Sequence, residues 1–189
     1  MINLDNAAVS FENFFPNPHL VRLKALTQKY YSREEHPDPV MMGVFPGKRT
    51  EIFTQIDKKL DKYFIHRVAD LLGFKGKIPL SAASSFSFTD AKAPIVSHRD
   101  DILHYGHQTY AGVVYLNPDI EPEAGTIVEG RLMPAKFNRL VLYDGRLLHS
   151  LAKTFGSNRF NSRLVLTTFY SFITDVEGAR ADSYLIQVN

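Results

Sequence analysis

His98 and Asp100 are separated by one residue in a short, β-prone run that follows Pro94. Side chains two positions apart on a strand point to the same face, so this imidazole and this carboxylate converge. Two neutral imidazoles and one carboxylate hold Fe(II) on one side and leave adjacent positions open, where a chelating small molecule and O2 can bind next to each other. The pair therefore predicts a mononuclear iron site that still needs one histidine.

His149 fits the missing ligand, which is expected from a distant strand. It follows the strand-like run 139–143 and a turn. A His-x-Asp pair alone is a common chance match in a chain with seven histidines. The order of the neighbouring elements strengthens the prediction, since an apolar run at 110–117 and a turn at 124–126 precede His149, and a further strand-like run at 161–170 follows it.

Arg163 is the expected anchor for an anionic cosubstrate. It opens a strand-like run, and its planar guanidinium stays charged and can hold a carboxylate through two hydrogen bonds. Arg159 is the alternative, but it lies in a loop-like stretch, where a side chain is held less firmly. Thr167 and Phe169 share a strand face with Arg163, so they are expected to border the same pocket.

The region 81–172 resembles the iron(II)/2-oxoglutarate-dependent dioxygenase superfamily, and within it the prolyl-hydroxylase-like branch and small uncharacterised relatives. The resemblance implies that His98, Asp100 and His149 are the iron ligands and the catalytic centre. It also implies that Arg163 binds the distal carboxylate of 2-oxoglutarate. The implied cofactors are Fe(II), 2-oxoglutarate as cosubstrate and O2, with ascorbate as an optional addition.

Tyrosines are the expected source of a second hydrogen bond to the cosubstrate. Many relatives carry a tyrosine on the strand before the His-x-Asp pair, where this chain has phenylalanine. Tyr105, Tyr110 and Tyr115 are the candidates here, although a tyrosine in a strand is more often a packed core or rim residue. We expect Tyr110 and Tyr115 to contact the cosubstrate, and Tyr105 and Phe169 to border the substrate.

The implied reaction is oxidative decarboxylation of 2-oxoglutarate to succinate and CO2, coupled to hydroxylation of a C–H bond. Asp100 argues against halogenation, because halogenases of the family lack this carboxylate. Phe169 argues against nucleobase demethylation, because those relatives carry a second arginine there. A peptidyl or small-molecule substrate is therefore expected. Two alternatives remain: a jelly-roll binding protein that is non-catalytic or holds Zn or Ni, and a metal-free chain in which His98 and Asp100 only pair with each other.

The remaining histidines are expected to be solvated rather than metal ligands. His104 and His107 lie in the run 101–108, which we interpret as a mobile connection between strands that could act as a lid or face the substrate. Three histidines of the N-terminal part are likewise expected to be solvated and not to bind metal: His19, His36 and His66.

The first 77 residues are predicted to be mostly helical. One helix, over about 18–31, has Leu20, Leu23, Leu26 and Tyr30 at helical spacing, as expected for a buried stripe. A second helix is expected to be capped by Thr50, to bury an apolar stripe within 53–71 and to end at Gly73. Lys48 and Arg49 are interpreted as exposed charges.

From residue 78 onward, short strands separated by turns predict two packed sheets rather than alternating βαβ units. We therefore expect a mainly β fold with supporting N-terminal helices, a double-stranded β-helix (cupin-like jelly roll). The length suits one domain over 1–189, with mostly helical support in 1–77 and the jelly-roll core in 78–189.

Composition argues against several other classes of protein. The net charge is only +2, so no attraction to nucleic acid is expected. No stretch is apolar for long enough to cross a membrane, and the N-terminus lacks the features of a secretory signal, which together predict a soluble, intracellular (cytoplasmic) protein. The chain has no cysteine, which excludes disulfides and thiolate metal sites.

Overall fold

A computed structural model describes residues 8–37, 45–73, 80–100 and 109–172. Its helices are α1 (Pro18–Thr27), α2 (Phe53–Ile56), α3 (Lys58–Leu71) and the 3-10 helix η2 (Pro122–Ala124). Its strands are β1 (Ala8–Phe11), β2 (Lys48–Arg49), β3 (Leu80–Thr89), β4 (Thr109–Tyr115), β5 (Thr126–Val128), β6 (Arg131–Met133), β7 (Leu140–Asp144), β8 (His149–Leu151) and β9 (Arg163–Phe172). Within these residues, no helix combines the length and the apolar character needed to span a membrane.

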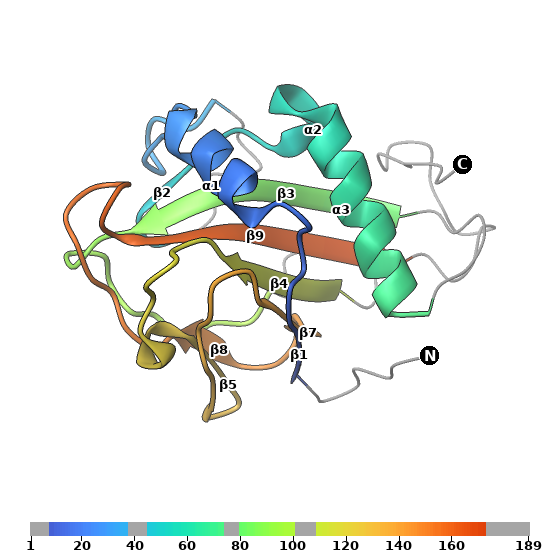
Figure 1. Cartoon of the computed structure of the whole chain (residues 1–189). Coiled ribbons are helices and arrows are strands. Elements are labelled where there is room, and N and C mark those ends of the chain that lie inside the picture. The colour runs from blue at the N-terminus through green and yellow to red at the C-terminus, as the bar shows by residue number, and fades with distance from the viewer. Residues whose placement is uncertain (1–7, 38–44, 74–79, 101–108, 173–189) are drawn as a thin grey trace.

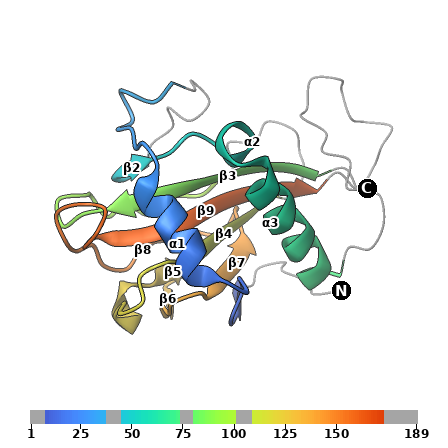
Figure 2. The same ribbon diagram turned by 45° about the horizontal axis from the view of Figure 1, so that its top comes forward.

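The strands form two antiparallel sheets. The large sheet has the order β1-β7-β4-β9-β3-β2, and the small sheet has the order β6-β5-β8. Helices α1, α2 and α3 lie on one side of the large sheet and the small sheet lies on the other, as two views that differ by 45° both show (Figures 1 and 2). The prediction of a mainly β chain with packed sheets and a few supporting helices is confirmed.

Alternate residues of the large sheet serve two separate cores. On β9, Leu164 and Leu166 pack toward the helices, whereas Val165 packs toward the small sheet. β4 alternates in the same way, with Val114 on the helix-covered face and Val113 on the face between the sheets. This period of two, which the pleated backbone imposes, gives each strand of the large sheet one face for each layer.

The N-terminal part supplies strands as well as helices. β1 pairs with β7 along one edge of the large sheet, and β2 pairs with β3 along the other edge. β2 also receives an isolated bridge between Tyr31 and Arg49. Because these edges are covered by strands from the N-terminal residues, this part of the chain is built into the sheet that carries the site.

The predicted helix over 18–31 is shorter than expected, and of its predicted apolar stripe only Leu26 and Tyr30 pack against the core. α1 ends at Thr27, because Gln28 is extended and leads the chain toward its bridge with β2. Leu20 and Leu23 are 65% and 58% exposed, so their predicted burial is wrong. Ala25 is buried instead, because α1 turns this side toward the sheet.

The predicted second helix is divided in two. Asp57 breaks it between α2 and α3 and then caps α3, accepting a hydrogen bond from the Leu60 amide. Thr50 is not the cap, since its hydroxyl accepts a hydrogen bond from the Phe86 amide on β3. The apolar stripe nevertheless packs in the core as predicted, with Phe53, Phe64 and Val68 fully buried.

Two predictions of exposure in the N-terminal part are also wrong. His36 is buried, with its Nε2 atom 3.1 Å from the carbonyl oxygen of Thr50. Arg49 is half-buried as a residue, and its Nε atom is fully buried. Its neighbour Lys48 is exposed, as predicted.

Candidate metal centre and cosubstrate pocket

His98 and His149 lie directly opposite each other on paired extended segments. Each backbone amide donates to the other residue's carbonyl oxygen, with both N···O distances 2.9 Å. The two imidazole rings are 4.3 Å apart between centroids. A pair that exchanges both backbone hydrogen bonds has a fixed register, so the two side chains are held on one face by the backbone itself.

Asp100 completes a cluster of three metal-ligating side chains. It lies two residues after His98, and its amide donates to the Gly145 carbonyl oxygen at 2.7 Å, which continues the pairing. Its carboxylate lies 3.6 Å from His98 Nε2 and 3.2 Å from His149 Nε2. One candidate ligand atom from each of the three residues falls within 4.8 Å of the others.

Both imidazoles are oriented by backbone carbonyl oxygens. Nδ1 of His98 lies 3.1 Å from the Val96 oxygen, and Nδ1 of His149 lies 2.8 Å from the Leu147 oxygen. A carbonyl oxygen can only accept, so Nδ1 is the donor in each ring, and Nε2 is the atom left to bind a metal. Outer hydrogen bonds of this kind are typical of metal-ligating histidines.

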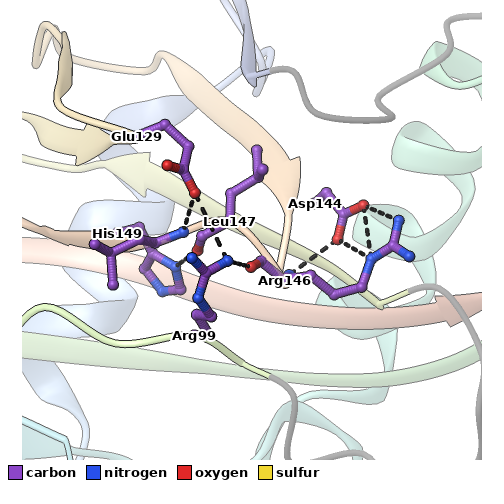
Figure 3. A network of polar contacts seen from close by, with 7 residues as sticks. Arg99, Glu129, Asp144, Arg146, Leu147 and His149 are labelled. Atoms are coloured by element: carbon purple, nitrogen blue, oxygen red, sulfur yellow. Dashed lines mark hydrogen bonds and ion pairs between the residues drawn. The ribbon is translucent and has the colours of Figure 1, made fainter.

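The turn that carries His149 is secured by a network of polar contacts (Figure 3). Asp144 is buried and pairs with the Arg146 guanidinium. Arg99, on the opposite side of its segment from the ligands, donates to the Arg146 carbonyl oxygen and pairs with Glu129 at 3.7 Å. Glu129 in turn accepts a hydrogen bond from the Leu148 amide at 2.7 Å. The residues flanking both histidines are therefore tied to each other.

Charge and burial act against each other at His149. Burial would lower the pKa of His149, but the neighbouring Asp100 carboxylate and the Leu147 carbonyl outweigh burial and raise the pKa above its usual value. The Oδ2 atom of Asp100 is buried beside His149 Nε2, and it accepts no hydrogen bond among the described residues. A buried carboxylate oxygen without a donor is costly, and a bound cation would remove that cost.

Arg163 lies at the start of β9 and is 1% exposed. Its guanidinium donates to the Ala124 carbonyl oxygen at 3.0 Å and to Thr126 Oγ1 at 3.3 Å. Burial lowers the pKa of Arg163, and the neighbouring Tyr115 opposes that shift. Within the described parts of the chain, no carboxylate lies within ion-pair distance of this guanidinium, which makes it a site for an anion that the protein does not itself supply.

One pocket joins this arginine to the three candidate ligands. Thr167 and Phe169 also line it, on the same face of β9 as Arg163. The pocket thus brings together most of the residues that the sequence singled out. Tyr115 lies beneath rather than within it: its ring is 5.2 Å from the Arg163 guanidinium and its hydroxyl is 2.8 Å from Thr126 Oγ1.

Tyr110 and Arg159 are not part of this pocket. Tyr110 belongs to the core between the helices and the large sheet, so its predicted contact with the cosubstrate is wrong. The reason is strand periodicity, since Tyr110 and Tyr115 are five positions apart and an odd spacing places them on opposite faces of β4. Arg159, the alternative to Arg163, instead donates to the Gln28 carbonyl oxygen at 2.8 Å. Tyr105, His104 and His107 lie outside the described residues.

Arg49 and Thr89 are among the pocket residues that sequence reasoning did not find. Arg49 lines the pocket, where burial lowers its pKa to about 10, opposed by the nearby Asp100 carboxylate and Tyr143. Thr89 lies opposite Arg163 in the pairing of β3 with β9 and has a buried hydroxyl without a partner among the described residues. The alternation of Ser85, Ser87 and Thr89 along β3 was a usable signal for a polar pocket face; for Arg49 the sequence offers none.

The chain was compared with family models, curated proteins and solved structures, and only solved structures match it. No family model matches the sequence, and no curated protein matches it either. A 2OG-Fe(II) oxygenase family oxidoreductase from Burkholderia pseudomallei has a TM-score of 0.58 at 14% identity, over 88% of this chain and 85% of the other. A prolyl hydroxylase from Trichoplax adhaerens, in complex with a peptide of hypoxia inducible factor, has a TM-score of 0.57 at 16% identity, over 89% and 84%.

The chain has the fold of the 2OG-Fe(II) oxygenases. HygX from Streptomyces hygroscopicus, solved with nickel, 2-oxoglutarate and hygromycin B bound, adds a third case, with a TM-score of 0.57 at 14% identity over 94% of this chain and 89% of the other. The resemblance inferred from the sequence motifs is therefore matched at the level of the fold. In this chain the fold carries a His-Asp-His cluster suited to a metal ion.

Proposed function

We propose that this chain is an Fe(II)- and 2-oxoglutarate-dependent dioxygenase that hydroxylates a C–H bond of a peptidyl or small-molecule substrate, with release of succinate and CO2. One observation carries the proposal: a His-Asp-His cluster and a buried arginine without a carboxylate partner among the described residues share one pocket. A metal site alone fits many proteins, but this combination suits a ligand that chelates a metal at one end and is anionic at the other.

For the fold, we propose a more specific architecture than two packed sheets. We assign the sheets as the two halves of a double-stranded β-helix, with the site between them. The whole chain, 1–189, would form one domain, with its mostly helical support in 1–77 and its jelly-roll core in 78–189. The similarity to oxygenase structures over most of both chains supports this assignment.

His98, Asp100 and His149 would hold the Fe(II) ion. The fit rests on the Nε2 atoms of the two imidazoles, which face the Asp100 carboxylate, and on Asp100 Oδ2, which accepts no hydrogen bond among the described residues. When bound, Fe(II) would supply the redox chemistry that activates O2 and couples decarboxylation of 2-oxoglutarate to hydroxylation. The chain's own contribution is to orient the two rings through their Nδ1 atoms.

Arg163 would bind the distal carboxylate of 2-oxoglutarate. The guanidinium is already held by the Ala124 carbonyl oxygen and by Thr126, so little side-chain entropy would be lost on binding. Tyr115 would act from beneath by fixing this arginine, and Thr167 would border the cosubstrate. The Thr89 hydroxyl, across from Arg163, is the best placed donor for a second hydrogen bond to the same carboxylate.

The substrate would meet Phe169 at the pocket wall, and Tyr105 remains a proposed substrate contact. The neighbouring solved structures include one with a peptide and one with hygromycin B bound, which supports keeping both substrate classes. Nucleic acid is not proposed as a partner, because the net charge of the chain is only +2.

The test is an anaerobic titration of metal-free protein with Fe(II) and then 2-oxoglutarate. The expected result is the weak visible charge-transfer band between metal and cosubstrate, followed by succinate release when O2 is admitted, with and without ascorbate. Metal binding without this band would favour a binding protein that holds Zn or Ni. Failure to take up any metal would overturn the proposal and leave His98 and Asp100 as a simple polar pair.

A further inference from the structure

Arg49 is a second cation in the pocket that the proposed chemistry does not use. It lies on β2, lines the same pocket as the His-Asp-His cluster, and is close enough to Asp100 for their charges to interact. Among the residues that the structure describes, no carboxylate lies within ion-pair distance of Arg49, and its buried Nε has no hydrogen-bond partner. A buried guanidinium with an unused donor is costly unless it meets an anion.

The position of Arg49 is fixed by the backbone on both sides of it. Its amide donates to the Tyr31 carbonyl oxygen at 3.0 Å, and its carbonyl oxygen accepts from the Tyr31 amide at 2.8 Å. Gly47, with a φ of +79°, makes the turn before β2, and a Cβ there would lie 2.1 Å from the Phe88 carbonyl oxygen. Only glycine fits this approach, so the turn that delivers Arg49 to the pocket is sharply constrained.

Aromatic rings then hold the guanidinium itself. Its central carbon lies 4.4 Å from the ring centroid of Phe45 and 5.8 Å from that of Phe169. Contacts with ring faces hold the flat group while leaving its N–H edge free to donate. Arg49 is thus arranged as a recognition group rather than as a solvated charge.

The two arginines reach the pocket from different strands. Arg163 lies on β9 and is held by Ala124 and Thr126. Arg49 pairs with Ser87, which pairs in turn with Val165, so β3 separates the two arginines. The Arg49 guanidinium contacts Phe45 and Phe169, and its charge interacts with that of Asp100. A cosubstrate anchored by Arg163 can therefore leave Arg49 free on the Asp100 side.

The sum of the charges in a pocket that holds Fe(II) and 2-oxoglutarate indicates the charge of the prime substrate. Fe(II) would bring two positive charges and 2-oxoglutarate two negative ones, which cancel. Asp100 then offsets one of the two arginines. The pocket lining contains no other Asp, Glu or Lys among the described residues, so one positive charge remains. A single carboxylate matches it.

We propose that Arg49 binds a carboxylate of the prime substrate beside the metal centre, so that the substrate is an acid. This inference rests on the proposed function. The carboxylate can belong to a small carboxylic acid or to a peptide, at its C-terminus or on a side chain, because the same guanidinium edge would hold each of them. Arg49 would thereby select the substrate and direct a C–H bond near its carboxylate toward the metal.

The test compares acids with their uncharged amides. Protein loaded with Fe(II) and 2-oxoglutarate under anaerobic conditions is titrated with N-acetyl amino acids and short peptides, each paired with its amide, while the charge-transfer band and the heat of binding are followed. The best small or peptide acid is expected to bind at least about tenfold more tightly than its amide, as for a charge-assisted hydrogen bond. Which group of acids binds identifies the source of the carboxylate.

Variants then assign this preference to Arg49. In Arg49→Gln the ratio of acid to amide affinity is expected to fall to about one. Lys48→Gln is the matched control, because Lys48 is the exposed neighbour on β2 and loses the same charge, and there the ratio should stay at the wild-type value. Arg49→Lys keeps the charge without the planar fork and should give an intermediate ratio, which also covers the case in which Arg49→Gln does not fold.

Three results would overturn the inference. The first is equal binding of acids and amides by the wild-type protein, or no acid binding at all. The second is an acid preference that survives in Arg49→Gln. The third is loss of the charge-transfer band in Arg49→Gln, which would make Arg49 the cosubstrate anchor. Failure of the proposed function is distinct, because the wild-type protein would then form no band with Fe(II) and 2-oxoglutarate before any acid is added.

Discussion

The two faces of β9 show how one strand serves two purposes. On the helix-covered face, Leu164 and Leu166 are fully buried in the larger core. On the face toward the small sheet, Arg163 and Thr167 line a polar pocket. Adjacent residues of β9 therefore have different roles. One face of the strand packs in the core and stabilises the fold, while the other face can contact ligands.

β3, which pairs with β9, also has one face in the core and one face toward the pocket. Phe86 is buried toward the helices, whereas Ser85, Ser87 and Thr89 fall on the other face, with Thr89 and Ser87 lining the pocket. The polar face gains little from its own weak contacts, such as the 3.4 Å pair between the Ser85 and Thr167 hydroxyls. Stability should thus be sensitive to changes on the helix-covered face and ligand binding to changes on the pocket face.

The largest effect is expected for His149→Ala on the pocket side. Loss of a metal ligand should weaken Fe(II) binding by more than about 100-fold, since loss of a supporting hydrogen bond alone often costs about 10- to 100-fold. Turnover should fall by at least as much, measured as succinate released with excess 2-oxoglutarate. The free energy of unfolding of the metal-free protein should change little. A variant that still forms the charge-transfer band would contradict the ligand assignment.

Leu166→Ala and Thr167→Ala compare the two faces at adjacent positions. Leu166→Ala should lower the free energy of unfolding by about 3 kcal/mol and the Tm by about 10 °C, because it leaves a cavity in the helix-covered core. Thr167→Ala should cost less than about 1 kcal/mol but weaken 2-oxoglutarate binding. Denaturant unfolding and ligand titration of both variants measure the contrast. Similar stability losses in the two would refute it.

Arg163→Lys should weaken 2-oxoglutarate binding by about 30-fold, or about 2 kcal/mol, with the charge retained. The reason is that lysine lacks the planar fork that holds a carboxylate through two hydrogen bonds. Arg159→Lys is the matched control, because Arg159 contacts the Gln28 carbonyl oxygen instead of the pocket. Unchanged affinity in Arg163→Lys, measured by anaerobic titration, would remove Arg163 as the anchor.

The smallest effect is expected at Asp61, a buried carboxylate in the helical layer. Burial, and after it the Asp57 carboxylate, raises the pKa of Asp61 from 3.8 to about 6. The folded state thus favours the protonated form, and the stability that it gives is present below about pH 3.8 and lost as the pH rises through about 6. Asp61→Asn should therefore stabilise the protein by about 1 kcal/mol at pH 7.5 and hardly at all at pH 4.

The measurement is urea unfolding of wild-type and Asp61→Asn protein from pH 4 to pH 8. The difference between them should grow between pH 4 and pH 7 and then level off. A constant difference across this range would mean that Asp61 does not titrate as its burial implies.

Much of the candidate site was predictable because its chemistry is local or ordered along the chain. The His98 and Asp100 pair needs only the period of a strand, and His149 and Arg163 were placed by the strands beside them. The structure brings these four residues into one pocket. The prediction was wrong at Tyr110, which lies on the face of β4 away from the pocket. It was also wrong at Arg49, which was expected to be exposed but lines the pocket.

The sequence by itself determined the ligand types, the alternation along each strand and the mainly β character, because these depend on residue chemistry and on a backbone period of two. Only the tertiary structure decided which face of β4 meets the pocket, which side of α1 is buried and that β2 delivers Arg49 beside Asp100. Periodicity shows which residues share a face, but not what that face meets. That depends on pairings between segments far apart in the chain, such as the bridge from Tyr31 to Arg49.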